Sequence, residues 1–306
     1  MSRRSFVQLG VAGMASLGLG DVLRAKAASK KVAADKSNVS TILIWLDGGP
    51  GHMDMYDMKP DAPVEYRGIW QPIKTVVPGF DVTELYPRQA KHTNKFSIVR
   101  SLHHDTGDHF AGAHRMLTSK NMGVSGANNI GKFPGIGAIV AQQRKKLNRE
   151  VPPYVAVPTA SSVGRVPGYF AGKFLGVQYD PFMTKGDPNA ENFTVQNMVL
   201  PSGITVDRLD DRTELRSQLD TISRTIESRG TFDALDQFDQ QAFSFVAGDK
   251  ARQAFDMSQE DDKTRERYGR HTQGQSTLLA RRLVEAGASF VFLIFGGWDH
   301  LWHLDG

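Results

Sequence analysis

Two continuous apolar segments, near the start and the end of the chain, dominate its hydrophobic pattern. Residues 40–46 read Ser-Thr-Ile-Leu-Ile-Trp-Leu, and residues 289–295 read Ser-Phe-Val-Phe-Leu-Ile-Phe. Neither segment alternates apolar with polar positions, as a strand with one face in water would. We therefore predict two parallel strands, buried on both faces in the interior of a sheet and each followed by a glycine-rich loop.

Shorter patterns predict the remaining elements. Two further strands are expected at residues 96–102 and 155–157. Helices are expected at residues 108–117, 135–147, 212–229, 232–247 and 272–286, the last of them with Gly287 as its C-cap. Residues 160–201 are rich in Gly, Pro and aromatic residues without clear periodicity, and we interpret them as a long irregular insertion. Helices interspersed with apolar strands predict an α/β fold.

The first residues have the layout of a cleavable export signal. Ser2-Arg3-Arg4-Ser5-Phe6 precedes a Gly- and Ala-rich apolar stretch, and Ala25-Lys26-Ala27 is a small-residue cleavage site. The paired arginines are the twin-arginine form of this signal, which a receptor reads. We expect a signal peptide at 1–29, a polar linker at 30–39 and one domain at 40–306, exported by the twin-arginine translocase to the periplasm or outside the cell.

Composition narrows the possible functions. The chain has no cysteine, which excludes disulfides, thiolate nucleophiles and iron–sulfur clusters. Its net charge of +4 belongs partly to the signal, so the mature protein is close to neutral and shows no basic face for nucleic acid. After the signal no segment reaches about 18 uninterrupted apolar residues, so no stable membrane span is expected.

Histidines and aspartates gather where predicted elements end. Seven of the nine histidines fall into three groups. The groups are Asp47, His52, Asp54 and Asp57 after the first strand, His103, His104, Asp105, Asp108, His109 and His114 between the second strand and the helix at 108–117, and Asp299, His300 and His303 after the last strand. Carboxylates with neutral imidazoles are ligands for divalent metals such as zinc or manganese. The alternative is that they cap turns and helices, and for Asp54 and Asp57 we favour that alternative.

Several motifs together resemble an exported bacterial family, domain of unknown function 1501. They are Leu46-Asp47-Gly48-Gly49-Pro50-Gly51-His52-Met53-Asp54, Arg100-Ser101-Leu102-His103-His104, Phe133-Pro134-Gly135-Ile136-Gly137, Pro152-Pro153-Tyr154-Val155, Phe174-Leu175-Gly176, Tyr179-Asp180-Pro181-Phe182, Arg265-Glu266-Arg267-Tyr268-Gly269, Leu279-Ala280-Arg281-Arg282-Leu283-Val284-Glu285-Ala286-Gly287 and Gly297-Trp298-Asp299. The resemblance runs in order from about residue 40 to the end.

That family resembles a branch of the alkaline phosphatase and sulfatase superfamily. The resemblance implies a mostly parallel sheet flanked by helices, and metal-dependent hydrolysis of phosphate or sulfate esters. It assigns metal binding to Asp47, Asp299 and His303, with His300 competing for the role of His303. The metal would be zinc, manganese or calcium. The substrate would be the ester of a small molecule or a polysaccharide.

No residue of this chain matches the nucleophile of the superfamily directly. Counting back from Leu117-Thr118-Ser119 places the nucleophile near His109, and Thr106 is a nearby hydroxyl. His104 and His114 would orient ester oxygens. The family usually has Ser after Gly-Gly-Pro, where this chain has Gly51.

The end of the sequence also departs from the family pattern. Family members continue with motifs that supply further Asp and His ligands, and these 306 residues do not contain them. We therefore interpret the fold as incomplete at the C-terminus and expect the chain alone to be nearly inactive. The alternatives are a complete small domain with the last strand at its edge and, for function, a non-catalytic surface protein that binds polysaccharide. Its stacking residues would be Tyr169, Phe170, Phe174, Tyr179 and Phe182, although for these aromatic residues we favour packing in the core.

Overall fold

The computed structural model of the protein describes residues 39–49, 51–121, 132–144, 151–162, 166–195 and 249–296. Its main sheet has four strands in the order β1-β6-β4-β5, and all pairs are parallel. The strands are β1 (Thr41–Asp47), β4 (Tyr154–Val157), β5 (Phe182–Met183) and β6 (Phe290–Gly296). The predicted α/β class, with a mostly parallel sheet, is confirmed for these residues.

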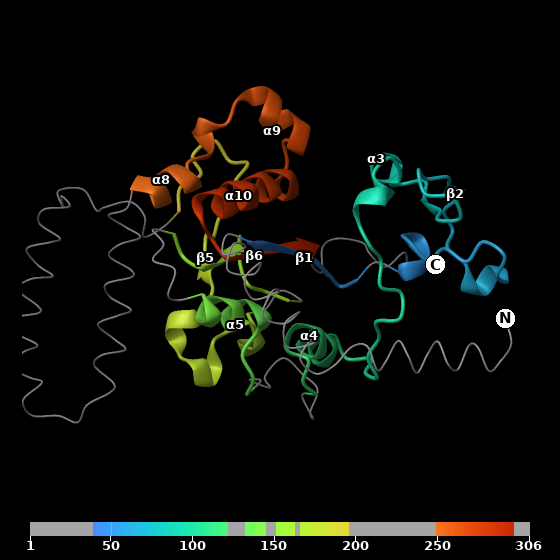
Figure 1. Ribbon diagram of the computed structural model, residues 1–306, viewed down its shortest axis with the longest axis horizontal. Helices are drawn as coiled ribbons and strands as arrows, with labels where there is room; N and C mark the ends of the chain where they lie inside the picture. Colours follow the sequence, from blue (N-terminus) through green and yellow to red (C-terminus); the bar gives the residue numbers. More distant parts are fainter. Residues whose placement is uncertain are drawn as a thin grey trace, which may run out of the picture. The chain divides into compact units, whose positions relative to one another are not determined.

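Helices cover both faces of this sheet (Figure 1). One face packs against α8 (Asp249–Phe255) and α10 (Thr272–Ala286), which share a core with Val291 and Leu293 of β6. The other face packs against α4 (His109–Thr118) and α5 (Ile136–Gln143), which share a core with Phe290 and Phe292. Alternate residues of β6 therefore serve opposite cores, which explains why its sequence is continuously apolar.

Smaller elements complete the described chain. They are the antiparallel pair β2 (Pro72–Ile73) and β3 (Val82–Thr83), the helices α3 (Pro87–Ala90) and α9 (Asp262–Tyr268), and the 3₁₀ turns η1 (His52–Asp54), η2 (Val64–Tyr66), η3 (Thr93–Lys95), η4 (Gly168–Phe170), η5 (Lys173–Leu175), η6 (Val177–Tyr179) and η7 (Met257–Gln259). Turns η4, η5 and η6 fall within the predicted irregular insertion, but that prediction missed β5. The predicted helices at 212–229 and 232–247 lie outside the described residues.

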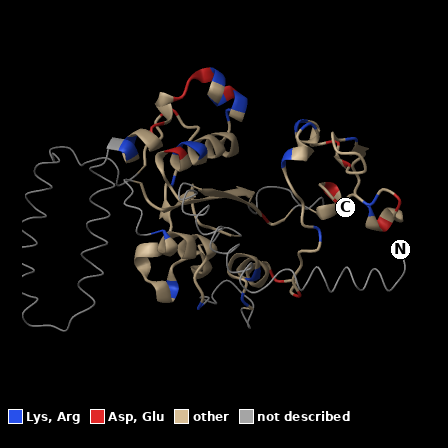
Figure 2. Cartoon of the chain, viewed as in Figure 1, with Lys and Arg blue, Asp and Glu red and all other residues tan. Residues whose placement is uncertain are grey.

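A buried polar network fixes α9 and α10 to each other. The Gln275 side chain, which has no exposed surface, donates to the Arg265 and Gly269 carbonyls and accepts from the Arg265 side chain at 2.8 Å. Glu260 accepts from Arg281 at 2.9 Å and from Arg282 at 2.7 Å. Acidic and basic residues are mixed along these two helices, which lets such ion pairs form (Figure 2). Since removing one partner of a buried network leaves the others unsatisfied, this network holds the start of α10 in place.

Two predictions about strands are wrong. Strand β1 is an edge strand of the described sheet, and its Ile42 and Ile44 side chains are 38% and 45% exposed, so it is not buried on both faces. The reason is that α10 packs mainly over β6, and β1 lies beyond it. Residues 96–102 form no strand. Phe96 instead packs against the rings of Tyr56 and Phe80, because β-rich residues form a strand only where a partner strand is available.

Candidate functional site

Asp47 is the last residue of β1 and lies at the carboxyl edge of the sheet. It is level with Gly296 of the neighbouring parallel strand β6. Gly48 and Gly49 follow with φ of 80° and 65°, a conformation that glycine adopts without strain, so the chain turns immediately after the carboxylate. The two apolar segments at the start and the end of the chain are thus neighbouring parallel strands. Ligands in open parallel sheets bind at this edge.

The Asp47 carboxylate is buried and held by two donors. Its side chain is 2% exposed. The Ser162 hydroxyl donates to Oδ1 at 3.0 Å, and the Trp45 indole Nε1 donates to the same oxygen at 3.1 Å. A buried carboxylate needs such partners because its removal from water is costly. These contacts fix the orientation of the carboxylate at the sheet edge.

Tyr169 lies beside this carboxylate and is almost fully buried. Burial raises its pKa well above the ordinary value, and the nearby charges of Asp47 and Asp108 raise it further. The Ser162 hydroxyl lies near the Tyr169 hydroxyl and offsets part of this rise in pKa, but it donates to Asp47 and does not meet Tyr169 with the geometry of a hydrogen bond. Among the described residues the Tyr169 hydroxyl has no hydrogen-bond partner. The phenol therefore stays protonated and can donate to a ligand.

His114 of α4 extends the site behind Tyr169. Its ring is 1% exposed and meets the Tyr169 ring edge-on, with 5.8 Å between centroids. Its Nδ1 lies 2.9 Å from the Lys120 carbonyl, which can only accept, so Nδ1 carries the proton. Nε2 is then an acceptor, and it is buried without a partner in the described part of the chain. Burial lowers the pKa of His114, partly offset by the bond to Lys120, and keeps the ring neutral.

This environment of His114 predicts a pH-dependent stability. Because its pKa is lower in the folded state than the ordinary 6.5, the unfolded chain binds the proton more tightly. The free energy of unfolding should therefore hold above pH ~7 and fall as the pH drops below about 6.5. Urea unfolding at several pH values measures this slope. His114→Gln should flatten it, whereas His92→Gln, at an exposed histidine, should not; equal slopes in all three proteins would contradict the prediction.

The loop before α4 brings two further predicted residues together. The Asp108 backbone N–H donates to Thr106 Oγ1 at 3.2 Å, and the Thr106 N–H donates to His104 Nδ1 at 3.4 Å. The Asp108 side chain caps α4 by accepting from Ala111 N at 2.8 Å, which confirms the predicted helix start. A Cβ on Gly112 would lie 2.9 Å from His104 Nε2, so only glycine lets this ring lie against α4.

The other predicted site residues are placed as follows. His109 is the first residue of α4 and is exposed. Asp299, His300 and His303 lie outside the described residues; β6 ends at Gly296, three positions before Asp299. Asp57 pairs with Lys59 at 3.2 Å and with Arg100 at 3.5 Å. Across residues 39–296, where the structure describes them, no three His, Asp or Glu side chains form a cluster able to hold a metal.

Sequence reasoning missed three contributors to this site. The sequence predicts no function for Ser162 or Trp45, and the only function that it suggests for Tyr169 is stacking on a sugar ring. A signal for Ser162 was available, since it follows the predicted strand at 155–157 and parallel strands share their carboxyl edge. Trp45 and Tyr169 offered no such signal, because only the folded chain shows which polar atom of an aromatic residue meets a carboxylate.

Together, the fold and this site define an α/β protein that carries a buried carboxylate at the carboxyl edge of a mostly parallel sheet. The sequence profile of the protein family of unknown function DUF1501 matches residues 38–303, and the chain belongs to this family. No curated protein and no solved structure shows a significant match to the chain. In the described residues no helix is long and apolar enough to cross a membrane.

Proposed function

We propose that this protein is an exported, metal-dependent hydrolase of phosphate or sulfate esters, with the alkaline phosphatase and sulfatase superfamily as its wider relatives. The observation that carries the proposal is the Asp47 carboxylate, buried at the carboxyl edge of the sheet and level with the end of β6. The motif with Asp299 follows β6 directly in the sequence. Export by the twin-arginine translocase to the periplasm or beyond remains part of the proposal and rests on the N-terminal sequence.

The residues around Asp47 suit a divalent metal. A buried carboxylate is a ligand type for zinc and manganese, and carboxylates also suit calcium. In the proposal Asp47 binds the ion together with Asp299 and either His303 or His300. When bound, such an ion polarises the ester oxygens and stabilises the charge that develops on them.

The remaining residues of the site would position the ester. Thr106 and His109 stand at the start of α4, where backbone N–H groups favour an anionic group. The Asp108 N–H donates to the Thr106 hydroxyl oxygen and so fixes its position. In the proposal this oxygen would form a bond to the phosphorus or sulfur of the ester, the bond to the leaving alkoxide would break, and the hydroxyl proton would pass through solvent to that alkoxide. His104 would orient an ester oxygen, and the protonated Tyr169 hydroxyl would donate to another. The sequence predicts the same role for His114, but its Nδ1 proton is donated to the Lys120 carbonyl, so its Nε2 can only accept a hydrogen bond from a protonated group of the substrate.

The proposal is tested with aryl phosphates and aryl sulfates in the presence of zinc, manganese or calcium. We expect metal-dependent release of the aryl alcohol, however slow, that Asp47→Ala abolishes. Asp57→Ala removes a carboxylate of the surface ion pairs and should have no effect. Turnover that survives Asp47→Ala, or the absence of any metal-dependent turnover, would argue against this function.

A second candidate, a non-catalytic polysaccharide-binding protein, has one observation in its favour. Phe174 is 72% exposed and could stack on a sugar ring, with the 69% exposed Val177 near it in sequence. Of the other aromatic residues considered for stacking, Tyr169, Phe170 and Tyr179 are buried, which confirms the favoured interpretation that they pack in the core. Glycan binding that Phe174→Ala removes and Asp47→Ala leaves unchanged would favour this candidate.

A further inference from the structure

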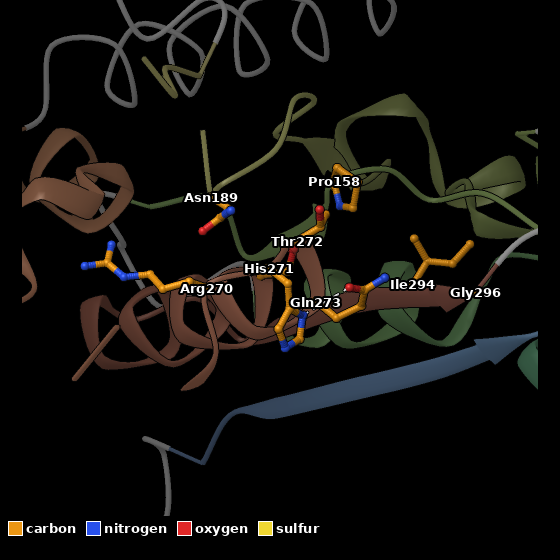
Figure 3. A pocket seen from close by; sticks show the side chains of 9 residues that line it. Pro158, Asn189, Arg270, His271, Thr272, Gln273, Ile294 and Gly296 are labelled. Atoms are coloured by element: carbon orange, nitrogen blue, oxygen red, sulfur yellow. Dashed lines mark hydrogen bonds between the residues drawn. The ribbon is translucent and has the colours of Figure 1, made fainter. Parts of the chain in front are cut away.

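A pocket of about 500 Å³ opens where the start of α10 meets the carboxyl ends of the sheet strands. Its walls come from three parts of the chain: Pro158 after β4, Asn189 after β5, and Ile294 with Gly296 of β6, all facing the first turn of α10 (Figure 3). A volume of this size accommodates a small organic ligand. Among the described residues that line the pocket, none is assigned above to ester hydrolysis.

Hydrogen bonds make the walls of this pocket rigid. Thr272, the first residue of α10, donates its hydroxyl to Asp187 Oδ2 at 2.9 Å, and the Asn189 N–H donates to Asp187 Oδ1 at 2.8 Å. One carboxylate thus ties the segment after β5 to the helix. His271 caps α10 by accepting from the Gly274 N–H at 3.2 Å. The side chains that line the pocket are therefore already in place before a ligand binds.

An unsatisfied hydroxyl in the pocket points to a ligand. Ser276 lines the pocket and is 1% exposed, yet its Oγ has no hydrogen-bond partner among the described residues. Buried polar groups are rarely left unpaired, and an orphan at a cavity wall calls for a partner inside the cavity. Ser276 is one helical turn after Thr272, on the same face of α10.

The residues that line the pocket specify the chemistry of that partner. The described residues that line the pocket include no Asp or Glu, so these residues provide no negative charge to bind a cation. Arg270 carries a formal charge, but it forms an ion pair with Asp262. The Arg270 side chain extends away from the other labelled residues (Figure 3). The Asn189 and Gln273 amides and the Ser276 hydroxyl each both donate and accept. Pro158 and Ile294 add an apolar surface.

We propose that this pocket binds a sugar ring. Sugar hydroxyls donate and accept in the same way as amides and serine, and the C–H face of the ring matches the apolar surface of Pro158 and Ile294. Gly296 lines the pocket and is level with Asp47 across two strands that lie about 4.8 Å apart. The pocket would therefore hold the sugar part of an ester whose charged group lies at Asp47, a role that rests on the proposed function.

Direct binding to the full chain tests the pocket independently of turnover. The probes are glucose, galactose, mannose and N-acetylglucosamine, titrated against the protein by ligand-observed NMR. We expect saturable binding of at least one probe, weakened about tenfold by Gln273→Ala and severalfold by Ser276→Ala, because each change removes a hydrogen-bonding group. Alanine is a strong helix former, so both variants should fold.

Two matched variants serve as controls. Gln143→Ala changes a helical glutamine of α5 outside the pocket. Ser289→Ala removes another buried hydroxyl, just before β6 begins, for which the described part of the chain offers no hydrogen-bond partner. Both should bind the probe like the wild type. Asp47→Asn should also keep the binding, even where it abolishes turnover, so failure of the pocket and failure of the proposed function give different results. The absence of saturable binding, or equal weakening in the variants and controls, overturns the inference.

Discussion

Asp47→Asn is expected to weaken the binding of a divalent metal at least about a hundredfold while the protein stays folded. Asparagine has the same shape, and its Oδ1 can still accept from Ser162 and Trp45, so these two hydrogen bonds persist. What is lost is the negative charge that a metal requires. Loss of residues that only support metal ligands costs about 10- to 100-fold in affinity, so loss of a ligand should cost more.

Isothermal titration with zinc and with manganese measures this effect. Asp57→Asn removes the same charge from a carboxylate that forms surface ion pairs with Lys59 and Arg100, and we expect unchanged affinity for that variant. Thermal unfolding of each variant shows whether the fold is retained. Equal affinities of the wild type and Asp47→Asn would mean that Asp47 is not a metal ligand.

Phe292→Ala is expected to lower the free energy of unfolding by about 3–5 kcal/mol, because it leaves a cavity in the core. Phe292 lies in β6, between β1 and β4, and is 1% exposed. Its ring centre is 4.9 Å from that of Phe170. The same strand ends at Gly296, beside Asp47, so the change should also disturb the candidate site.

Urea unfolding of Phe292→Ala and Phe174→Ala provides a matched comparison. Phe174 is 72% exposed, and its replacement should change the free energy of unfolding by no more than about 0.5 kcal/mol. If the two variants lose similar stability, the core assigned to β6 is wrong.

The sequence predicted elements that carry their own start and stop signals. The helix expected at 272–286 has these same bounds in the structure, and Gly287 ends it with φ of 116° as the predicted C-cap. Strand β6 was predictable because both of its faces are buried and its apolar run has no polar interruption. The start of α4 was predictable because Asp108 is a favoured N-cap residue and stands directly before the helical pattern.

The elements that sequence reasoning misjudged depend on partners distant in the chain. The run at 40–46 is as apolar as β6, but nothing in it shows that α10 would cover β6 and leave Ile42 and Ile44 partly exposed. Strand β5 is only two residues long and exists because β4 pairs with it. Residues 96–102 have the composition of a strand but form none. Phe96 packs against the rings of Tyr56 and Phe80.

The candidate site was predictable only where its residues follow an element that the local sequence predicts. Asp47 stood out because it follows an apolar strand, and its place beside the end of β6 follows from parallel pairing. Its partners Ser162 and Tyr169 are more than a hundred residues away in sequence, and their roles emerge only from packing. His114 was identified by residue type, whereas its unpartnered Nε2 is visible only in the folded protein.

The proposed function requires that Asp47 and Asp299 bind one shared cation. The most direct test is to titrate zinc into the wild type, Asp47→Asn, Asp299→Asn and the double variant. For a shared ion, each single change should remove nearly all of the binding, and the double variant should bind no more weakly than either single variant. Metal affinity that either single variant retains in full, or losses that simply add in the double variant, would contradict the claim.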